Sequence, residues 1–322
     1  MKVLRIIEPG KAEWQEAPVP KPEQEEVLVE VQAATACPHW DFNIFDGKPI
    51  APNFKQDYPC PPGQPGHEMS GVVVEIGTRV QNIKVGDRIA VWRDSGPNRQ
   101  GCYAQYVALP AENVMAAPRN LPKEALTSLE LAMCVQVSFD QLRQNVGIHD
   151  MRLGVAGLGP AGLIAVQMAK AYGAREVVGV DPLRERRKLA KTLGADEVYA
   201  PDDPNFPISR NNETSLDVAV ETSGLKISIE AMMGRAKKAV AMFGVLREVI
   251  EYGPSHWHGG FALLGYGEHN RDAADRALNL IQQEKLDLKP LISRTMPFTQ
   301  YAESIALLRD RKAIKIMYNP WQ

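Results

Sequence analysis

The sequence predicts a two-domain α/β protein, in which a β-rich, barrel-like domain is joined to a doubly wound parallel sheet. The chain has 322 residues, more than one hydrophobic core usually organises. Its first third holds short alternating strands between Gly- and Pro-containing turns, which is typical of a compact antiparallel barrel. From residue 152 onward strands alternate with helical segments, which indicates βαβ units. We expect one domain to comprise residues 1–121 and 290–322, and the other residues 122–289.

The composition excludes several classes of protein. Lys and Arg number 37 against 39 Asp and Glu, so the chain lacks the cationic surplus that binds nucleic acid or anionic membranes. The longest uncharged run, Leu153–Ala169, has 17 residues including four Gly, which is too short and too broken for a bilayer span. The opening residues lack the apolar core of a signal peptide, and four scattered Cys make no disulfide framework. We therefore expect a soluble, cytoplasmic protein whose partners are small molecules.

The strands expected in the first domain are short runs of alternating or β-branched residues. They are Glu26–Ala33, Gly71–Ile76, Arg88–Trp92 and Tyr103–Leu109. Between the first two, Pro49–Pro65 contains six prolines in seventeen residues, which predicts an ordered surface loop without regular structure.

The second domain is expected to open with a helix over Lys123–Asn145, where apolar residues recur at helical spacing. The strands that follow are Leu153–Ala156, Glu176–Val180, Leu216–Glu221, Ala239–Val245 and Phe261–Gly265. The helices between and after them are Ala161–Tyr172, Glu185–Leu193, Ile227–Arg235, Ala273–Glu284 and a last one around Tyr301–Asp310.

A GxGxxG hexapeptide, Gly157–Gly162, stands between the first of these strands and its helix. In that context each glycine has a mechanical role, since Gly157 allows the tight turn, Gly159 lets a pyrophosphate approach the backbone, and Gly162 lets helix and strand pack closely. The N–H groups at the start of the helix, from Pro160 and Ala161 onward, then hold the diphosphate. The motif predicts a dinucleotide site.

Asp181 ends the second strand, 24 residues after Gly157. A carboxylate there can accept hydrogen bonds from the adenosine ribose and would repel a 2′-phosphate, so it favours NAD over NADP. Arg184, Arg186 and Arg187 keep the alternative open, because a guanidinium can bind a 2′-phosphate.

Residues with metal-binding side chains gather outside the GxGxxG unit. His67 lies in Gly66-His67-Glu68, Cys37 lies upstream, and Glu130 and Cys134 lie on the helix that leads into the second domain. A catalytic zinc takes about three protein ligands and keeps one position open. Cys37, His67 and either Glu130 or Cys134 could supply them.

Taken in order, these segments resemble the zinc-dependent medium-chain dehydrogenase/reductases, the alcohol and polyol dehydrogenase superfamily. The resemblance rests on Gly66–Glu68 with Gly71 and Val74–Gly77, Val85–Arg88, Gly101–Val107, Gly157–Gly162, Asp181 with Glu185–Arg187, Leu193–Asp196 and Asp217–Gly224. It implies a GroES-like barrel as catalytic domain and a Rossmann cofactor domain.

The resemblance also implies roles for individual residues. Cys37 and His67 would be zinc ligands, with Glu130 as the third in polyol-dehydrogenase-like members. Glu68 would be a carboxylate able to swing onto the metal, and Asp41 the acid that orients the ligand histidine. Further cofactor contacts are expected from Cys134, near the nicotinamide, and from Arg186, Ser223 and Gly244.

Three departures from the family pattern stand out. Residues 91–101 contain no Cys, so we expect one catalytic zinc and no structural zinc. Cys37 and Asp41 are four residues apart instead of three, which puts Pro38 at the usual ligand position, and the usual Ser or Thr between them is missing. His39 is the titratable residue left to carry the substrate proton. Asn43 replaces a histidine that many relatives use to pass it to solvent.

The sequence therefore predicts a zinc- and NAD-dependent alcohol or polyol dehydrogenase, working as a homodimer or homotetramer. Catalytic roles fall to His39, Asp41 and Glu68, and Trp40, Phe42, Trp92 and Trp257 could line the substrate cleft. Two alternatives remain open: a zinc-free quinone or enoyl reductase of the same superfamily, and a dinucleotide-binding protein without turnover.

Overall fold

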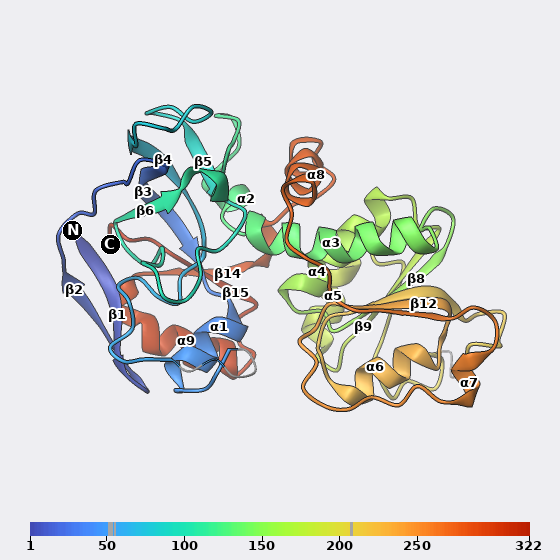
Figure 1. Ribbon diagram of the computed structural model, residues 1–322. Coiled ribbons are helices and arrows are strands. Elements are labelled where there is room, and N and C mark those ends of the chain that lie inside the picture. Colours follow the sequence, from blue (N-terminus) through green and yellow to red (C-terminus); the bar gives the residue numbers. More distant parts are fainter. Residues whose placement is uncertain (51–53, 55, 207–208) are drawn as a thin grey trace. The chain divides into compact units, whose positions relative to one another are not determined.

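The computed structural model describes residues 1–50, 54, 56–206 and 209–322. The chain divides into two compact units, Met1–Leu131 with Leu288–Gln322, and Ala132–Asp287. Both chain ends belong to the first unit (Figure 1). Within the described residues, no helix is long and apolar enough to cross a membrane.

The first unit is built on a curved, mainly antiparallel sheet with strand order β14-β15-β3-β4-β5-β7, in which β6 also pairs with β3. A separate hairpin, β1–β2, precedes it. The strands are β1 (Lys2–Glu8), β2 (Lys11–Glu16), β3 (Glu26–Thr35), β4 (Glu68–Ile76), β5 (Arg88–Val91), β6 (Tyr106–Pro110), β7 (Val114–Ala116), β14 (Ile292–Met296) and β15 (Lys315–Tyr318). The helices are α1 (Pro38–Phe45), α2 (Lys123–Leu126), α9 (Tyr301–Arg309) and the start of α3 (Leu129–Asn145).

The first unit's core joins its two sequence segments. Buried side chains from the N-terminal strands, such as Val29 and Met69, share one cluster with Phe298, Tyr301 and Tyr318 from the C-terminal segment. The C-terminal segment is therefore an integral part of this unit, because β15 pairs directly with β3.

The second unit is a six-stranded sheet in which every pairing is parallel, with order β10-β9-β8-β11-β12-β13. Numbered from β8, this is the order 3-2-1-4-5-6 of a doubly wound sheet, whose ligands bind at the carboxyl ends of the strands. The strands are β8 (Arg152–Ala156), β9 (Glu176–Val180), β10 (Glu197–Tyr199), β11 (Leu216–Glu221), β12 (Ala236–Met242) and β13 (Ala262–Leu264). The helices are α4 (Pro160–Ala171), α5 (Arg184–Thr192), α6 (Lys226–Met233), α7 (Pro254–Trp257), α8 (Arg271–Gln282) and the rest of α3. The predicted fold class is confirmed.

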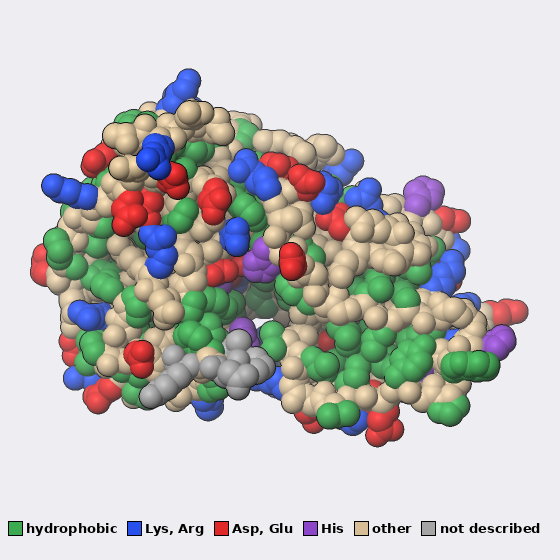
Figure 2. Space-filling view, in the orientation of Figure 1, with side chains coloured by type: hydrophobic (Ala, Val, Ile, Leu, Met, Phe, Trp, Pro, Cys, Tyr) green, Lys and Arg blue, Asp and Glu red, His purple; other side chains and the backbone are tan. Residues whose placement is uncertain are grey.

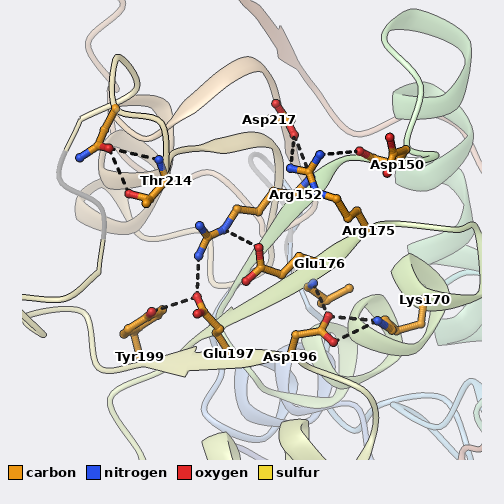
Figure 3. A network of polar contacts seen from close by, with 12 residues as sticks. Asp150, Arg152, Lys170, Arg175, Glu176, Asp196, Glu197, Tyr199, Thr214 and Asp217 are labelled. Carbon is orange, nitrogen blue, oxygen red and sulfur yellow. Dashed lines mark hydrogen bonds and ion pairs between the residues drawn. The ribbon is translucent and has the colours of Figure 1, made fainter.

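Charged side chains tie the amino ends of these strands together (Figure 3). Arg152, the first residue of β8, lies 3.2 Å from Glu176 and 2.5 Å from Glu197, the first residues of β9 and β10. Its backbone N–H donates to Asp217 of β11. The ion pairs therefore join the amino ends of the strands and leave their carboxyl ends available for a ligand.

Some predicted elements differ from those observed. The helix expected over Lys123–Asn145 is interrupted at Thr127, whose hydroxyl donates to the Lys123 carbonyl and contacts Ser70, so that α2 and α3 are separate. The strand expected over Ala239–Val245 begins and ends three residues earlier. In the proline-rich segment Pro49–Pro65, residues 51–53 and 55 lie outside the described residues, and the rest contains no helix or strand.

Candidate metal centre and dinucleotide loop

Cys37 stands at the N-cap of α1, where the chain leaves β3. Pro38 takes the first helical position, which suits its fixed φ and missing N–H. Asp41 follows one helical turn later, and its carboxylate accepts the Cys37 N–H at 2.8 Å. The four-residue spacing is thus the spacing of one helical turn, and the thiol of Cys37 stands where the helix begins.

His67 is fixed on two sides. Its Nδ1 lies 2.9 Å from the Pro65 carbonyl oxygen, so Nδ1 carries the proton and Nε2 is the ring nitrogen left for Cys37 or a metal ion. The indole of Trp40 packs against the ring, with centroids 4.6 Å apart. The ligand atoms of Cys37, His67 and Glu68 all lie within 4.8 Å of one another. Donors bound tetrahedrally to one zinc at about 2.0–2.3 Å lie roughly 3.3–3.8 Å apart, so a small contraction of this set would let it share a metal ion.

Negative charge surrounds this imidazole. Burial lowers the pKa of His67, but the charge and hydrogen bond of Cys37, together with the charge of Glu130, outweigh burial and place the pKa well above its ordinary value. Glu130 itself is 6% exposed and lies in the first turn of α3. The site therefore favours a cation, and the donor set of thiolate, imidazole and carboxylate is one that zinc accepts.

The hydrogen bonds of Asp41 go to partners other than the histidine that the resemblance implied. Its carboxylate accepts hydrogen bonds from the Cys37 N–H, Tyr103 Oη and Tyr301 Oη, whereas His67 is oriented by Pro65. Burial raises the pKa of Asp41 to about 6, against the lowering effect of these hydrogen bonds. Asp41 thus holds the Cys37 N–H at the helix start, because the helix carries its carboxylate back toward the N-cap, and its role toward His67 stays a prediction.

His39 also has structural contacts that the sequence did not predict. Its Nε2 lies 3.0 Å from the Ile50 carbonyl oxygen, and its Nδ1 lies 3.4 Å from the Asn43 amide nitrogen. Asn43 in turn donates to the His39 backbone carbonyl. These contacts join α1 to the proline-rich segment, so a packing role competes with the predicted role in proton transfer.

A small pocket with room for roughly one water molecule adjoins His67 in the first unit. Its lining includes Trp40, Gln64, His67, Asp94, Ser95 and Gln100. Gln64 donates to the carbonyls of Gly96 and Arg99, which holds the wall in place. Trp92 lies outside the lining: it is buried, with its indole N–H on the Glu112 carbonyl. The pocket therefore mixes polar side chains with apolar ones such as Trp40, Val91 and Leu109.

The GxGxxG loop follows β8 and leads into α4, as the sequence predicted. Gly157 has a φ of +82°, a conformation that side chains disfavour. A Cβ at Gly162 would lie 1.8 Å from the Gly157 carbonyl oxygen, whereas a Cβ at Gly159 would meet its nearest neighbour, Arg186 Nη1, at 3.7 Å. Gly159 is the N-cap of α4 and Pro160 its first residue, with Ala161 next. The loop is tight at both ends and open in the middle, where a pyrophosphate would approach.

Asp181 lies at the carboxyl end of β9 and is 4% exposed. Its Oδ2 accepts the N–H of Leu158 in the loop, and its Oδ1 accepts the N–H of Leu183. Arg186 Nη1 lies 4.0 Å from Asp181 Oδ2. Asp181 and Arg186 thus lie next to each other beside the loop. An acceptor for a ribose hydroxyl and a cation for a 2′-phosphate are therefore both present.

Ser223 and Gly244 also lie at the carboxyl edge of the sheet. A Cβ at Gly157 would meet Ser223 at 3.3 Å, and a Cβ at Gly244 would meet the Gly224 backbone nitrogen at 2.0 Å. Ser223 itself donates its hydroxyl to Glu221. Ser223 and Gly244 therefore lie just after β11 and β12, and Ser223 lies beside the Gly157 turn of the loop.

Cys134 lies on α3, one helical turn after Glu130, and is 7% exposed. Its Sγ is 3.4 Å from Nε2 of His269, which precedes α8. His269 could not be singled out from the sequence, because the short polar segment before α8 carries no metal-ligand or nucleophile spacing.

Comparison with known proteins adds the family. The Alcohol dehydrogenase GroES-like domain matches residues 23–119, and the Zinc-binding dehydrogenase domain matches residues 160–255. An L-threonine 3-dehydrogenase of Thermococcus kodakarensis is 30% identical over 340 residues, covering 96% of this chain and 95% of the relative. One from Pyrococcus horikoshii is 29% identical over 351 residues, covering 99% of this chain and 98% of the relative.

The chain belongs to the medium-chain dehydrogenase/reductase superfamily. As a member it is an oxidoreductase that transfers hydride between an alcohol or polyol, or the corresponding carbonyl, and a nicotinamide cofactor. Solved structures share the fold. Galactitol-1-phosphate dehydrogenase from Escherichia coli has a TM-score of 0.86 at 23% identity, covering 99% of this dehydrogenase and 100% of that chain. The 2R,3R-butanediol dehydrogenase from Bacillus subtilis has a TM-score of 0.86 at 23% identity, covering 99% of each chain.

Proposed function

We propose that this dehydrogenase uses one zinc ion and NAD to oxidise a secondary alcohol or polyol, or to reduce the corresponding carbonyl. The observation that carries the proposal is the convergence of Cys37 and His67, with all donor atoms of their cluster within 4.8 Å, in a chain that also holds a complete GxGxxG loop. A zinc-free reductase would have no use for such a donor set, and a protein without turnover would need no open metal position.

The proposed metal ligands are Cys37, His67 and Glu130. His67 offers Nε2 because its Nδ1–H donates to the Pro65 carbonyl. Asp41 holds the start of helix α1, where the Cys37 thiol lies. Zinc, when bound, supplies a Lewis acid that polarises the substrate oxygen and lowers the pKa of an alcohol. Glu130 is preferred as third ligand because its charge acts on His67 within the first unit.

The proposed cofactor is NAD. Asp181 retains lone pairs beyond the two that it gives to Leu158 and Leu183, so it can accept a ribose hydroxyl. Its buried carboxylate would repel a 2′-phosphate. Arg186 opposes this preference, and a zinc-binding dehydrogenase from Sinorhizobium meliloti with a TM-score of 0.86 was solved with NADP bound, so the preference needs a direct test.

The substrate proton is proposed to leave through His39. With Nε2 toward the Ile50 carbonyl, Nδ1 is the atom able to accept a proton, and the Asn43 amide lies beside it. The polar residues beside His67, namely Gln64, Asp94 and Gln100, are proposed to face the hydroxyl groups of the substrate.

The active form is proposed to be a homodimer in the cytoplasm. Strand β13 is the edge of the second unit's sheet, and an unpaired edge can pair with another copy. Figure 2 shows hydrophobic side chains on the exposed face of the second unit, and the exposed apolar residues of this unit include Ile227, Val249 and Trp257. A dimer would cover both features.

The function is tested by measuring nicotinamide reduction with NAD and NADP over a panel of secondary alcohols and polyols that includes L-threonine and 2,3-butanediol, together with zinc analysis of the same preparation. Turnover that depends on zinc and prefers NAD supports the proposal. Turnover that survives complete zinc removal, or cofactor binding without turnover on any substrate, would contradict it.

A further inference from the structure

A buried ion pair includes Glu68, whose carboxylate lies close to the proposed ligands Cys37 and His67. Lys315 Nζ lies 2.7 Å from Oε1 and 2.6 Å from Oε2 of Glu68, and both side chains are 0% exposed. Lys315 is the first residue of β15 and Glu68 the first of β4, on either side of β3. Nζ also donates to the Ala36 carbonyl at 2.8 Å. The C-terminal segment thus places the Lys315 ammonium group next to residues from the N-terminal half of the chain.

The Glu68 carboxylate is fully engaged where it stands. Besides the two contacts from Lys315, its Oε2 accepts the Thr35 hydroxyl at 2.9 Å. That hydroxyl contacts Ser128 Oγ, also at 2.9 Å. A carboxylate with three donors in the protein interior has no electrostatic reason to leave them.

Glu68 is nevertheless within reach of a metal ion. Its carboxylate oxygen lies within 4.8 Å of Cys37 Sγ and of a ring nitrogen of His67. If Glu68 joined those two donors and Glu130, the zinc would carry three anionic ligands and its open position would be filled. Both effects would weaken the pull on a substrate oxygen, because that pull depends on net positive charge and on a vacant position.

We propose that Lys315 is a positioning residue that holds Glu68 outside the metal's ligand set. The ammonium neutralises the carboxylate where it stands, so that departure toward the metal would strand a cation in the core. The third ligand is then Glu130, and the fourth position stays open for the substrate. The inference rests on the proposed zinc site and adds to it a reason why the nearer carboxylate is not the ligand.

The test uses the full-length protein loaded with Co²⁺, whose visible absorption reports ligand number through the ligand-field bands and Cys37 through the thiolate charge-transfer band. Lys315→Met frees Glu68, so the ligand-field bands should weaken as a further ligand binds, and the metal should leave to a chelator more slowly than in the wild type. Glu68→Gln with Lys315→Met should restore the wild-type spectrum, as should Lys315→Arg. Lys312→Met, an exposed lysine paired with Asp310 just before β15, is the matched control.

The outcomes separate two roles for Lys315. If the lysine merely supports the fold, Lys315→Met should lose metal affinity, by about the 10–100-fold that is typical when a residue supporting a metal ligand is replaced. The protein that still holds Co²⁺ should then show unchanged ligand-field bands. That result overturns the inference. Should Lys315→Met not fold, Glu68→Gln alone decides: an unchanged Co²⁺ spectrum supports the inference, and an altered one shows that Glu68 is already a ligand. A wild-type protein with no thiolate charge-transfer band would overturn both this inference and the proposed zinc site.

Discussion

Replacing Gly162 with alanine places a methyl group where the second unit has no room for it. The Cβ would lie 1.8 Å from the Gly157 carbonyl oxygen, against the 3.0 Å below which real Cβ contacts essentially never fall, so helix α4 and the loop must separate by about 3.0 − 1.8 = 1.2 Å. Both atoms belong to the backbone or are fixed to it, so no side chain can rotate away. We expect a loss of about 3 kcal/mol, the upper end for overpacking, which corresponds to a fall in Tm of roughly 6–12 °C for a domain of this size.

Gly159→Ala is the matched comparison, because a Cβ there meets its nearest atom only at 3.7 Å. The fold should tolerate it, with a Tm close to that of the wild type, while the affinity for NADH falls at least about tenfold, since the methyl group occupies the approach of the pyrophosphate. Gly265→Ala, which has no atom within 4 Å, serves as the neutral control. Calorimetry and NADH fluorescence titration measure both quantities. A Gly162→Ala protein with the wild-type Tm, or a Gly159→Ala protein with the wild-type NADH affinity, would refute the assignment of these two roles.

Three further outcomes are expected. Asp181→Ala should narrow the preference for NAD over NADP in kcat/KM, and a native enzyme that prefers NADP would show that Arg186 decides instead. His39→Ala should lower kcat by roughly 10²–10⁴-fold at neutral pH with partial recovery at high pH, whereas an unchanged pH profile would leave His39 its contact with Ile50 alone. Cys60 and Cys102 should resist iodoacetamide in the native protein at pH 8, because burial raises the pKa of Cys60 to about 12 and that of Cys102 well above its ordinary value; rapid alkylation of either, seen by peptide mass mapping, would contradict their burial.

Local patterns predicted much of the fold. Most strands and helices of the second unit follow from periodicity and from the glycine loop, because parallel βαβ units are built from short-range signals, but the short β10 and α7 were not predicted. The strands β14 and β15 were not foreseen, because β14 pairs with β15 and β15 pairs with β3, which lies more than 250 residues earlier in the chain. Helix α1 was also missed, since Pro38 reads as a loop residue until it is placed at a helix start.

The candidate site divides in the same way. Cys37 and His67 could be singled out by residue type and spacing, and the structure brings them together. Their supports could not be found from the sequence, because a backbone carbonyl such as that of Pro65 carries no sequence signal. Lys315 stands 247 residues from Glu68, so nothing local connects them, and only the sheet order shows that they meet.

The claim that the metal is bound by Cys37, His67 and Glu130 is tested most directly by zinc analysis of purified variants. Wild-type protein and Cys134→Ser should each retain close to one zinc per chain. Cys37→Ser, His67→Ala and Glu130→Gln should lose it, while their NADH binding stays intact because the GxGxxG loop lies in the other unit. Stoichiometric zinc in Cys37→Ser or His67→Ala would contradict the site itself, and loss of zinc in Cys134→Ser with retention in Glu130→Gln would transfer the third position to the thiolate.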